Sequence, residues 1–473
     1  MPPVSPTTDL HFTLNGEAIA LNAVSPTQTL LSYLRQHGYV GTKEGCGDGD
    51  CGACTVAIVG ADAAGQPQYQ AVNSCLLPIG SLGGRQIYTV EGIANGSLHP
   101  VQQAMVDLGG SQCGYCTPGF IMSLFAGYYS DRVADEGTIE GNLCRCTGYL
   151  PIRRAAQRVA AASHEADDFS QLLGQVSTQL EGTSYSAQGQ QFYRPTQLSE
   201  VLELLAAHPD ATLVAGSTDL GLEMSWYRQH YPVMIALEAV TELHQLEQTD
   251  HQVIIGAAVP LSHIEDRLRG VFPCMDEMLH WFAARQVRNR ATLGGNLGTA
   301  SPIGDMPPVL LALDATLQVA SASGQREIAI ADFFQGYRVT ALQTNEVIVA
   351  ITIPKTLPPL ATRRLSQSYK VGKRGTDDIS IVAAAYRVDL DADNRIVAAR
   401  LAYGGVAATP IRAIAVEDWL VGQPWTVETV LAAKQQLQSA FTPMSDLRGS
   451  ADYRNRLIAN LFEKFFVEFS NCE

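Results

Sequence analysis

The sequence predicts a multidomain α+β protein. At 473 residues the chain is too long for one ordinary domain, and usual domain sizes suggest about three. The hydrophobic pattern changes along the chain from alternating segments to helical ones, and then to a stretch in which strands and helices alternate. With 46% hydrophobic and 17% charged residues, the composition is that of an ordinary globular protein that can build sizeable cores.

The first predicted domain, residues 1–88, is rich in β-structure and contains one short helix. His11–Leu21 alternates polar and apolar residues around an Asn-Gly pair, which is a strong hairpin signal. Thr29–His37 follows with its leucines on one helical face, and a glycine ends the helix.

The second predicted domain, residues 89–165, is helical. Val101–Leu108 has helical periodicity, Thr117 can cap a helix that starts with a proline, and Pro151 opens another helix. Short helices around tight turns that carry cysteines predict a small helical bundle.

Residues 166–190 are rich in Ser, Gln, Gly and Glu and are expected to be a linker, although 172–180 has some helical character. Strands and helices alternate over the next domain, residues 191–362. In residues 363–473, the strands Ile379–Asp389 and Arg395–Tyr403 precede helical segments, which predicts a small antiparallel sheet with helices.

Charge and composition exclude several classes of partner. The formal net charge of −15 argues against nucleic acid, because binding phosphate requires a basic face. No stretch is apolar enough for a membrane span, and the first residues have neither the basic nor the apolar region of a signal peptide. A cytoplasmic, reducing location is therefore expected, and the ten cysteines need an explanation other than disulfides.

Four of these cysteines form a first cysteine set: Cys46, Cys51, Cys54 and Cys75. The spacing C-x4-C-x2-C with a distant fourth cysteine is the plant-type [2Fe–2S] arrangement. The glycines of KEGCGDGDCGACT let the backbone wrap closely around a cluster. The alternative is a zinc site with four cysteines, but structural zinc usually shows two short C-x2-4-C knuckles.

A second cysteine set consists of Cys113, Cys116, Cys144 and Cys146. Taken alone, C-x2-C and C-x-C suit zinc and iron–sulfur equally. Two sets in tandem favour electron transfer, since one carrier can relay to another. Cys274 and Cys472 are isolated, and we interpret them as a buried thiol and a tail residue.

Two glycine-containing segments are candidates for binding a cofactor. Residues 211–224 read as a strand that runs into a Gly-Ser-Thr-Asp turn, which either cradles a pyrophosphate or is an ordinary turn. Residues 281–312 contain small polar groups between apolar flanks, with Asp305 free to accept from a ribose hydroxyl. The alternative here is a surface loop, but the apolar run Pro307–Leu313 favours burial. The polar set is Thr292, Gly294, Gly295, Asn296, Ser301 and Asp305.

The strings EGCGDGDCGACTV, GSQCGYCTPGF and GNLCRCTGYLPI, in this order, resemble the iron–sulfur domains of the xanthine oxidase family of molybdenum hydroxylases. The resemblance extends from about Leu10 to Tyr453 and includes both cofactor segments. It implies a plant-ferredoxin-like β-grasp domain, a helical-bundle [2Fe–2S] domain, a vanillyl-alcohol-oxidase-type FAD domain and a C-terminal α+β domain. It also implies that the eight cysteines of the two sets hold two [2Fe–2S] clusters.

The same resemblance implies roles for residues of the FAD half. It places Phe282 and Ile348 beside the flavin ring, where the family more often has Leu at the second position, and Lys370 near the flavin. It assigns FAD contacts to Thr292 and Asp305, and places Tyr337 and Lys373–Asp378 near the nicotinamide side. The residues expected at the pyrophosphate are Leu213, Val214, Ala215, Gly216, Ser217, Thr218, Asp219 and Leu220.

The family's molybdopterin domains have no counterpart in this sequence. A fused iron–sulfur and FAD chain is the division of the family's two-subunit bacterial xanthine dehydrogenases, whereas related carbon monoxide dehydrogenases usually split these parts. We therefore expect a molybdopterin-binding large subunit in an α2β2 heterotetramer, oxidation of hypoxanthine or xanthine to urate there, and NAD⁺ as acceptor here. No residue catalysing purine oxidation is expected in this chain. The alternatives are an aldehyde or N-heterocycle as substrate, or a stand-alone iron–sulfur flavoprotein that acts as a redox carrier or sensor.

Overall fold

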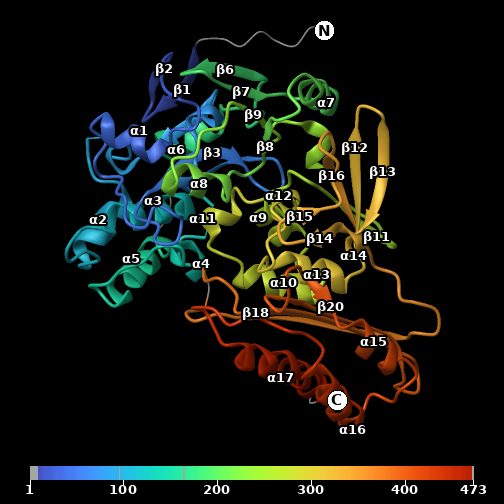
Figure 1. The fold of residues 1–473 in the computed structure, drawn as a ribbon. Helices are drawn as coiled ribbons and strands as arrows, with labels where there is room; N and C mark the ends of the chain where they lie inside the picture. Colours follow the sequence, from blue (N-terminus) through green and yellow to red (C-terminus); the bar gives the residue numbers. More distant parts are fainter. Residues whose placement is uncertain (1–8, 95, 131, 163–165, 376, 471–473) are drawn as a thin grey trace. The chain divides into compact units, whose positions relative to one another are not determined.

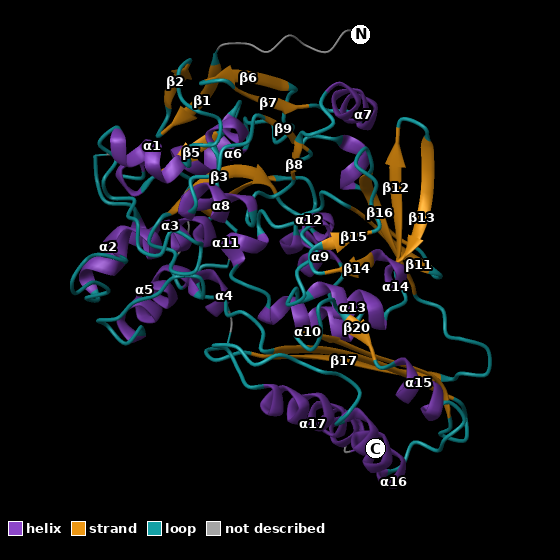
Figure 2. Cartoon of the chain, viewed as in Figure 1, coloured by secondary structure: helices purple, strands orange, loops and turns teal. Residues whose placement is uncertain are grey.

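The computed structural model describes residues 9–470 except 95, 131, 163–165 and 376 (Figure 1). The chain divides into two compact units that interleave along the sequence. Unit 1 comprises Met1–Thr241, Pro260–His263 and Ala283–Thr292, and unit 2 comprises Glu242–Val259, Ile264–Phe282 and Leu293–Glu473. Helices and strands are mixed in both units, which confirms the predicted multidomain α+β class (Figure 2).

Unit 1 begins with a five-stranded sheet of order β2-β1-β5-β3-β4. The predicted hairpin is present, with Leu10 opposite Leu21 and positive φ angles at Asn15 and Gly16. Helix α1 starts after Thr29, whose hydroxyl accepts from the backbone N–H of Ser32. The elements are β1 (Leu10–Leu14), β2 (Glu17–Leu21), α1 (Leu30–Gln36), β3 (Thr55–Ala61), β4 (Pro67–Asn73) and β5 (Gln86–Tyr88).

The helices that follow in unit 1 confirm the predicted bundle, with one local correction. Thr117 is not a cap: α3 begins at Thr117 itself, Cys116 takes the N-cap position, and the Thr117 hydroxyl donates to Ser111. The reason is that the cysteine turn leads directly into the helix. The helices are α2 (Pro100–Asp107), α3 (Thr117–Tyr128), α4 (Glu136–Ile139) and α5 (Leu150–Ala160).

Residues 166–190, expected to be a linker, contain helix α6 (Asp168–Leu173) and strand β6 (Thr183–Ala187). Phe169 packs among aromatic rings of unit 1, and its carbonyl accepts from the hydroxyl of Tyr69 at 3.0 Å. A polar composition concealed this anchoring, because a single ring is enough to fix a short helix to a core.

Strand β6 joins a second sheet of unit 1, of order β6-β7-β9-β8. β7, β9 and β8 are parallel, so their carboxyl ends meet at one edge, where ligands bind in such sheets. The further elements of unit 1 are β7 (Gln190–Arg194), α7 (Leu198–Ala207), β8 (Thr212–Val214), α8 (Leu220–Trp226), β9 (Val233–Ala236) and α11 (Arg285–Arg288).

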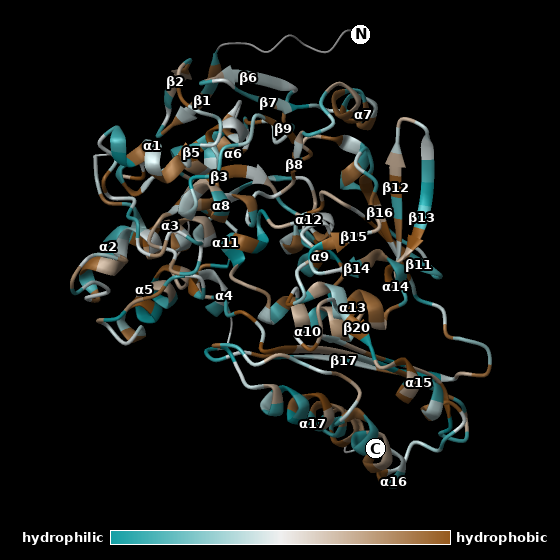
Figure 3. Cartoon of the chain, in the orientation of Figure 1, coloured by the Kyte–Doolittle hydropathy of each residue, from teal (hydrophilic) through white to brown (hydrophobic). Residues whose placement is uncertain are grey.

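Unit 2 contains an antiparallel sheet of order β10-β11-β16-β12-β13. The central strand β16 is buried along most of its length, whereas β13 is exposed and mostly hydrophilic (Figure 3). The strands are β10 (Leu246–Gln248), β11 (Gln252–Gly256), β12 (Thr316–Ser321), β13 (Gly324–Ala329) and β16 (Val347–Pro354), with a small ribbon of β14 (Phe334–Gly336) and β15 (Val339–Thr340). The helices are α10 (Pro273–Trp281), α12 (Leu293–Gly298), α13 (Met306–Ala312) and α14 (Ile330–Phe333), and α9 (Leu261–Arg267) runs across a unit boundary.

The last part of unit 2 is the predicted antiparallel sheet with helices, of order β17-β18-β19-β20. Every residue of β18 is buried, because α13 and α17 both pack on this strand. In α17 hydrophilic and hydrophobic residues alternate around the helix, with phenylalanines in the core (Figure 3). The elements are β17 (Arg363–Val371), β18 (Val382–Leu390), β19 (Ile396–Gly404), β20 (Ile411–Arg412), α15 (Ile414–Leu420), α16 (Val427–Leu437) and α17 (Ala451–Ser470).

None of the helices in the described ranges has the length and apolar character needed to cross a membrane. Cys274 is fully buried on α10, and burial raises the pKa of its thiol to about 11. Cys472 lies outside the described residues.

Candidate functional site

The first cysteine set lies on the loop between α1 and β3 and on a 3₁₀ turn after β4. The backbone N–H of Cys46 donates to Sγ of Cys51, and that of Cys51 donates to Sγ of Cys46, both at 3.3 Å. The thiols of Cys54 and Cys75 are hydrogen-bonded to each other. The set therefore consists of two pairs.

Within each pair one thiol ionises more readily than the other. The hydrogen bond from Cys46 lowers the pKa of Cys51 to about 6, and the same bond raises the pKa of Cys46. The hydrogen bond with Cys75 likewise lowers the pKa of Cys54. In the described part of the chain, no group of three or more Cys, His, Asp or Glu side chains is arranged to hold a metal ion. A [2Fe–2S] cluster takes two thiolates on each iron, so a pair of pairs fits this cluster better than a single zinc ion.

Two glycines show why the loop of the first set excludes larger residues. A Cβ at Gly45 would lie 2.6 Å from Sγ of Cys51. Gly52 has φ +64°, and a Cβ there would lie 2.1 Å from the carbonyl oxygen of Gly141. A side chain at either position would push the backbone away from the thiols.

The second cysteine set is built in the same way on the helical part of unit 1. Cys113 and Cys116 precede α3, and Cys144 and Cys146 lie between α4 and α5. The thiol of Cys113 is hydrogen-bonded to that of Cys146, and the thiol of Cys116 to that of Cys144. A backbone N–H from Tyr115, and then the Cys146 thiol, lower the pKa of Cys113. These two pairs also fit one two-iron cluster.

Hydrogen bonds to backbone carbonyl oxygens join the two sets directly. The N–H of Leu143, the residue before Cys144, donates to the carbonyl oxygen of Cys51 at 3.0 Å. The side-chain amide of Asn142 donates to the Gly52 carbonyl at 3.0 Å, and the Tyr115 hydroxyl donates to the carbonyl of Glu44. A ligand of one set is thus separated from a ligand of the other by one residue and one hydrogen bond.

The predicted pyrophosphate segment, Leu213–Leu220, begins in β8 and runs past the carboxyl edge of the second sheet to the first residue of α8. A Cβ at Gly216 would lie 1.8 Å from the carbonyl oxygen of Arg290, and Ser217 has φ +63°. Among the described residues, the backbone N–H groups of Gly216, Ser217 and Thr218 have no hydrogen-bond partner. Consecutive free N–H groups on a bent backbone suit a phosphate. The Ser217 hydroxyl is not available, because it donates to the carbonyl of Leu76 at 2.9 Å.

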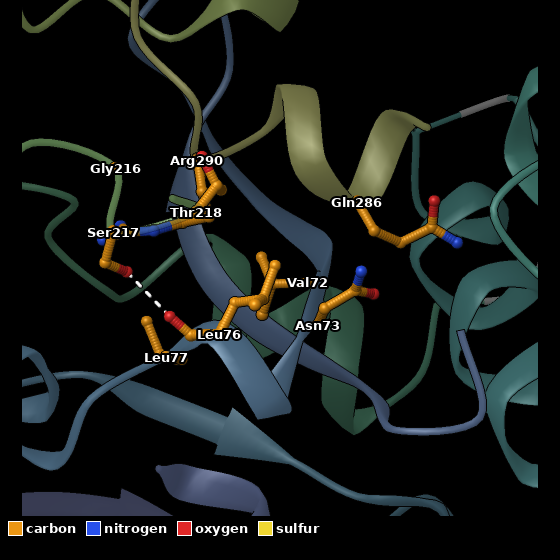
Figure 4. A pocket seen from close by; sticks show the side chains of 9 residues that line it. All are labelled: Val72, Asn73, Leu76, Leu77, Gly216, Ser217, Thr218, Gln286 and Arg290. Carbon is orange, nitrogen blue, oxygen red and sulfur yellow. Dashed lines mark hydrogen bonds between the residues drawn. The ribbon is translucent and has the colours of Figure 1, made fainter. Parts of the chain in front are cut away.

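A small pocket of unit 1 lies beside this loop (Figure 4). The amides of Asn73 and Gln286 extend toward the same side of the view, and both residues are buried. Oδ1 of Asn73, Oε1 of Gln286 and Nε of Arg290 have no hydrogen-bond partner among the described residues. The lining consists of Val72, Asn73, Leu76, Leu77, Gly216, Ser217, Thr218, Gln286 and Arg290.

Three arginines whose side chains are at most 12% exposed surround Glu238, just after β9 and close to the same loop. Oε2 of Glu238 lies 2.5 Å from Arg85 and 2.7 Å from Arg290, and Oε1 lies 3.6 Å from Arg194. Burial opposes ionisation of the carboxyl, but the three guanidiniums lower the pKa of Glu238 to about 2. Burial lowers the pKa of Arg85 to about 10. The cluster ties the first sheet, the second sheet and the Arg290 segment together.

In unit 2, Asp305 and Lys370 lie together as a buried ion pair of 2.8 Å. The hydroxyl of Ser380 donates to the other carboxylate oxygen of Asp305 at 2.5 Å. The expectation that Asp305 is free to accept from a ribose is therefore wrong in this respect, because both of its oxygens already accept hydrogen bonds. A carboxylate has further lone pairs, so an FAD contact stays a prediction.

The other predicted FAD residues occupy varied positions. Gly294 packs on Ala257, where a Cβ would lie 2.6 Å from the Ala257 side chain, and Oδ1 of Asn296 is buried without a partner among the described residues. Gly295 and Ser301 accept backbone hydrogen bonds through their carbonyls. Ile348 is buried on β16, Phe282 ends α10, and Thr292 is buried in unit 1. Their FAD contacts stay predictions.

Tyr337 and Lys373–Asp378, which are expected at the nicotinamide side, both belong to unit 2. Tyr337 is 65% exposed. In Lys373–Asp378, the carboxylate of Asp378 accepts from the backbone N–H groups of Lys373, Arg374 and Ile379, which is the pattern of a self-stabilised loop. Thr376 lies outside the described residues. An NAD⁺ role for this segment stays a prediction.

Several residues of these sites have no signal in the sequence. Trp226 donates to the carbonyl of the ligand Cys46 at 3.0 Å, and Ser380 completes the Asp305 pair. Glu238 and its three arginines come from four separate segments. Only their long-range contacts reveal them.

Comparisons with family models divide the chain into four regions. A 2Fe-2S iron-sulfur cluster binding domain matches residues 12–79, and a [2Fe-2S] binding domain matches residues 89–157. The FAD binding domain in molybdopterin dehydrogenase matches residues 185–356, and the CO dehydrogenase flavoprotein C-terminal domain matches residues 367–469.

Curated relatives carry the name xanthine dehydrogenase. The protein from Emericella nidulans is 34% identical over 97% of this chain and 38% of its own length. Xanthine dehydrogenase 1 of Arabidopsis thaliana is 34% identical over 98% of this chain and 40% of its own length. The chain thus spans about two fifths of the length of these relatives.

Solved structures match the fold of the flavin part. A chain of quinoline 2-oxidoreductase from Pseudomonas putida 86 is 30% identical, with a TM-score of 0.52, over 58% of this chain and 94% of that chain. A chain of carbon monoxide dehydrogenase from Hydrogenophaga pseudoflava is 28% identical, with a TM-score of 0.54 and the same coverage. Together with the two cysteine sets and the four family regions, these likenesses show that the chain belongs to the xanthine oxidase family of molybdenum hydroxylases, of which it is the iron–sulfur and FAD part.

Proposed function

We propose that this chain is the electron-transfer subunit of a cytoplasmic xanthine dehydrogenase. A molybdopterin-binding large subunit, in an α2β2 assembly, oxidises hypoxanthine and xanthine to urate. Electrons enter this chain at the second cysteine set, pass to the first, and leave through FAD to NAD⁺. The names of the curated relatives support the purine substrate.

The observation that carries the relay is the hydrogen bond from Leu143 N–H to the Cys51 carbonyl. It gives a short covalent and hydrogen-bonded route from the ligand Cys144 to the ligand Cys51. The hydrogen bonds of Asn142 and Tyr115 add two further links between the loops that carry the two sets. A short route of this kind suits transfer of one electron at a time.

We infer the point at which electrons enter the chain from the exposure of the cysteines. Cys113 and Cys146 are exposed, whereas Cys54 and Cys75 are buried. Apolar side chains around the second set are also exposed: Tyr115 at 49%, Leu143 at 47% and Leu150 at 53%. An exposed apolar patch of this kind marks an interaction surface, and we assign it to the large subunit.

FAD supplies the step between one-electron carriers and hydride transfer to NAD⁺. The loop Leu213–Leu220 holds the pyrophosphate with its free N–H groups. In unit 2, the ion pair of Asp305 and Lys370 is a separate candidate for FAD contact. We place the domain limits at 1–88, 89–165, 191–362 and 363–473, with β6 added to the flavin domain because it pairs with β7.

The test uses this chain co-expressed with its large subunit. We expect four irons, four inorganic sulfides and one noncovalent FAD per copy of this chain, and turnover of xanthine with NAD⁺ faster than with O₂. Zinc at either cysteine set, or flavin that stays on acid-precipitated protein, contradicts the cofactor assignment. Activity with O₂ alone contradicts the NAD⁺ assignment.

The second candidate is the same electron route serving another substrate. Solved structures that match this chain include a quinoline oxidoreductase and carbon monoxide dehydrogenases, which supports this candidate. Substrate choice lies in the large subunit, so the assay compares xanthine, an aldehyde, quinoline and carbon monoxide. A preference for any of the last three selects this candidate and leaves the relay unchanged.

A further inference from the structure

Helix α8 connects the pyrophosphate loop to the first cysteine set. It starts at Leu220, the last residue of the loop, and ends at Trp226. At its start, Gly221 packs so closely on Leu76, the neighbour of the ligand Cys75, that a Cβ would lie 2.4 Å from the Leu76 carbonyl oxygen. At its end, Nε1 of Trp226 donates to the carbonyl of the ligand Cys46 at 3.0 Å. One short helix therefore contacts both halves of the first set.

Trp226 has an unusual place for a tryptophan. Its side chain is 55% exposed, so packing in a core does not account for it. The edge of the indole lies against Gly47, where a Cβ would be 3.2 Å from Nε1 and 3.4 Å from Cδ1. Gly47 also has φ +79°, which keeps the position open for this approach. The ring thus covers one side of the Cys46–Gly47 backbone, and its single donor is used on that backbone.

We propose that Trp226 is a positioning residue that sets the reduction potential of the cluster held by the first cysteine set. The proposal rests on the proposed function, since it requires a [2Fe–2S] cluster on these cysteines. Reduction adds negative charge to the cluster, and potentials of such clusters depend on nearby hydrogen bonds and on solvent exposure. The indole N–H brings a positive dipole end to a ligand residue, and the ring limits the access of water.

These two effects have opposite signs, which makes the proposal testable with two variants. Trp226→Phe keeps a ring but removes the donor, so the reduced cluster is less stabilised and the potential becomes more negative. Trp226→Ala removes the ring as well, and water that reaches Cys46 and Gly47 stabilises the reduced cluster. The potential of the Ala variant is therefore more positive than that of the Phe variant.

The experiment is a redox titration of the co-purified complex, followed by electron paramagnetic resonance, in which the two clusters give separate signals. The second cluster is an internal standard, because the indole N–H of Trp226 donates to Cys46 of the first set and its ring lies against Gly47. The matched control is Trp281→Phe, which removes an indole donor to Glu277 at 2.8 Å in unit 2. We expect the potential of the first cluster to become more negative in Trp226→Phe and to be more positive in Trp226→Ala than in Trp226→Phe, with the second cluster and the control unchanged.

Unchanged potentials in both variants, or equal shifts of both clusters, overturn the proposal. A Phe variant more positive than the Ala variant overturns the assigned cause. Failure of the proposed function is a different result, because the unaltered complex would then lack one or both cluster signals. Phe is a conservative replacement that keeps the fold. If only the Ala variant loses its cluster signals, the shift in potential of the Phe variant decides the test.

Discussion

The two cysteine sets have the same chemistry in different surroundings. In the first set, Cys54 and Cys75 are 2% and 0% exposed and pack with apolar residues of α1 and α8. In the second set, Cys113 and Cys146 are exposed on loops. A buried set exchanges electrons with neighbours inside the chain, and an exposed one can exchange them with a partner. The difference in burial, rather than any difference in ligand type, therefore supports the proposed order of the two sets in electron transfer.

Removing a ligand of the exposed set tests this division most strongly. In Cys144→Ser, we expect xanthine-to-NAD⁺ turnover to fall by at least about 100-fold, because loss of even an outer contact of a metal ligand costs 10–100-fold. The flavin should remain reducible by NADH. The measurements are steady-state turnover and stopped-flow flavin bleaching. The control is Cys274→Ser, which alters a buried thiol outside both sets. Undiminished turnover in Cys144→Ser would falsify the assigned order.

The ion cluster around Glu238 lies close to the predicted pyrophosphate loop and combines three guanidiniums with one carboxylate. Glu238→Gln leaves three buried guanidiniums without their carboxylate, so the free energy of unfolding should fall by about 3–5 kcal/mol. Urea unfolding at pH 7 measures the loss. Glu346→Gln, at a partly exposed pair with Arg326, is the control and should cost about 1 kcal/mol or less. Equal losses of unfolding free energy in the two variants would show that the Glu238 cluster stabilises the fold no more than a partly exposed ion pair does.

The same carboxylate predicts a dependence of stability on pH. Its folded-state pKa of about 2 lies below its ordinary value of 4.5, so it adds stability that is complete above the ordinary value. This contribution disappears as the pH falls from about 4.5 to about 2. Unfolding measured at several pH values should show a shallower acid loss in Glu238→Gln than in the unaltered chain. Parallel curves would exclude the cluster as the cause.

Gly52 links the two sets through its contact with Gly141. In Gly52→Ala, the added Cβ meets the Gly141 carbonyl at positive φ, and we expect a cost of about 2–5 kcal/mol and loss of iron from both sets. Gly65→Ala is the matched control, since Gly65 has φ +83° but nothing within 4 Å, and only the strain of about 1 kcal/mol applies. Iron and sulfide content and thermal unfolding are measured. If the first set alone loses iron, the sets are less tightly joined than their contacts indicate.

Thiol accessibility gives the smallest and most direct comparison. After removal of iron, iodoacetamide should label Cys113 and Cys146 at least about tenfold faster than Cys54 and Cys75, because exposed thiolates react and buried thiols do not. Mass spectrometry of peptides at timed intervals gives the rates. Equal labelling of all four would mean that burial of the first set depends on its cluster.

The sequence was a good guide where structure is local. The Asn-Gly hairpin and the helices after Thr29 and Pro151 follow from turn and capping residues within a few positions. The linker expectation failed in part because Phe169 is fixed by contacts with distant aromatic rings. Composition reflects residues that are neighbours along the chain. The aromatic core that holds this segment is formed by residues that are distant in sequence.

The candidate site likewise combines residues that sequence spacing predicts with contacts that only the structure reveals. All eight cysteines stand out by spacing, and their pairing follows the two-iron chemistry. The sequence around Asp305 contains no sign of its partners, because Lys370 and Ser380 lie 65 and 75 residues away along the chain. The contacts of Leu143 and Trp226 with ligand carbonyls use a backbone N–H and an indole, and neither leaves a pattern in the sequence.

The interleaving of the two units fixes an order of events during synthesis. Both cysteine sets are complete once residue 146 has been made, whereas unit 1 also needs Ala283–Thr292. The contact of Gly216 with Arg290, and the ion pair of Arg290 with Glu238, cannot exist in a shorter nascent chain. A chain emerging from the ribosome therefore contains all eight cysteines of the two sets well before the contacts of the predicted pyrophosphate loop with Arg290 can form.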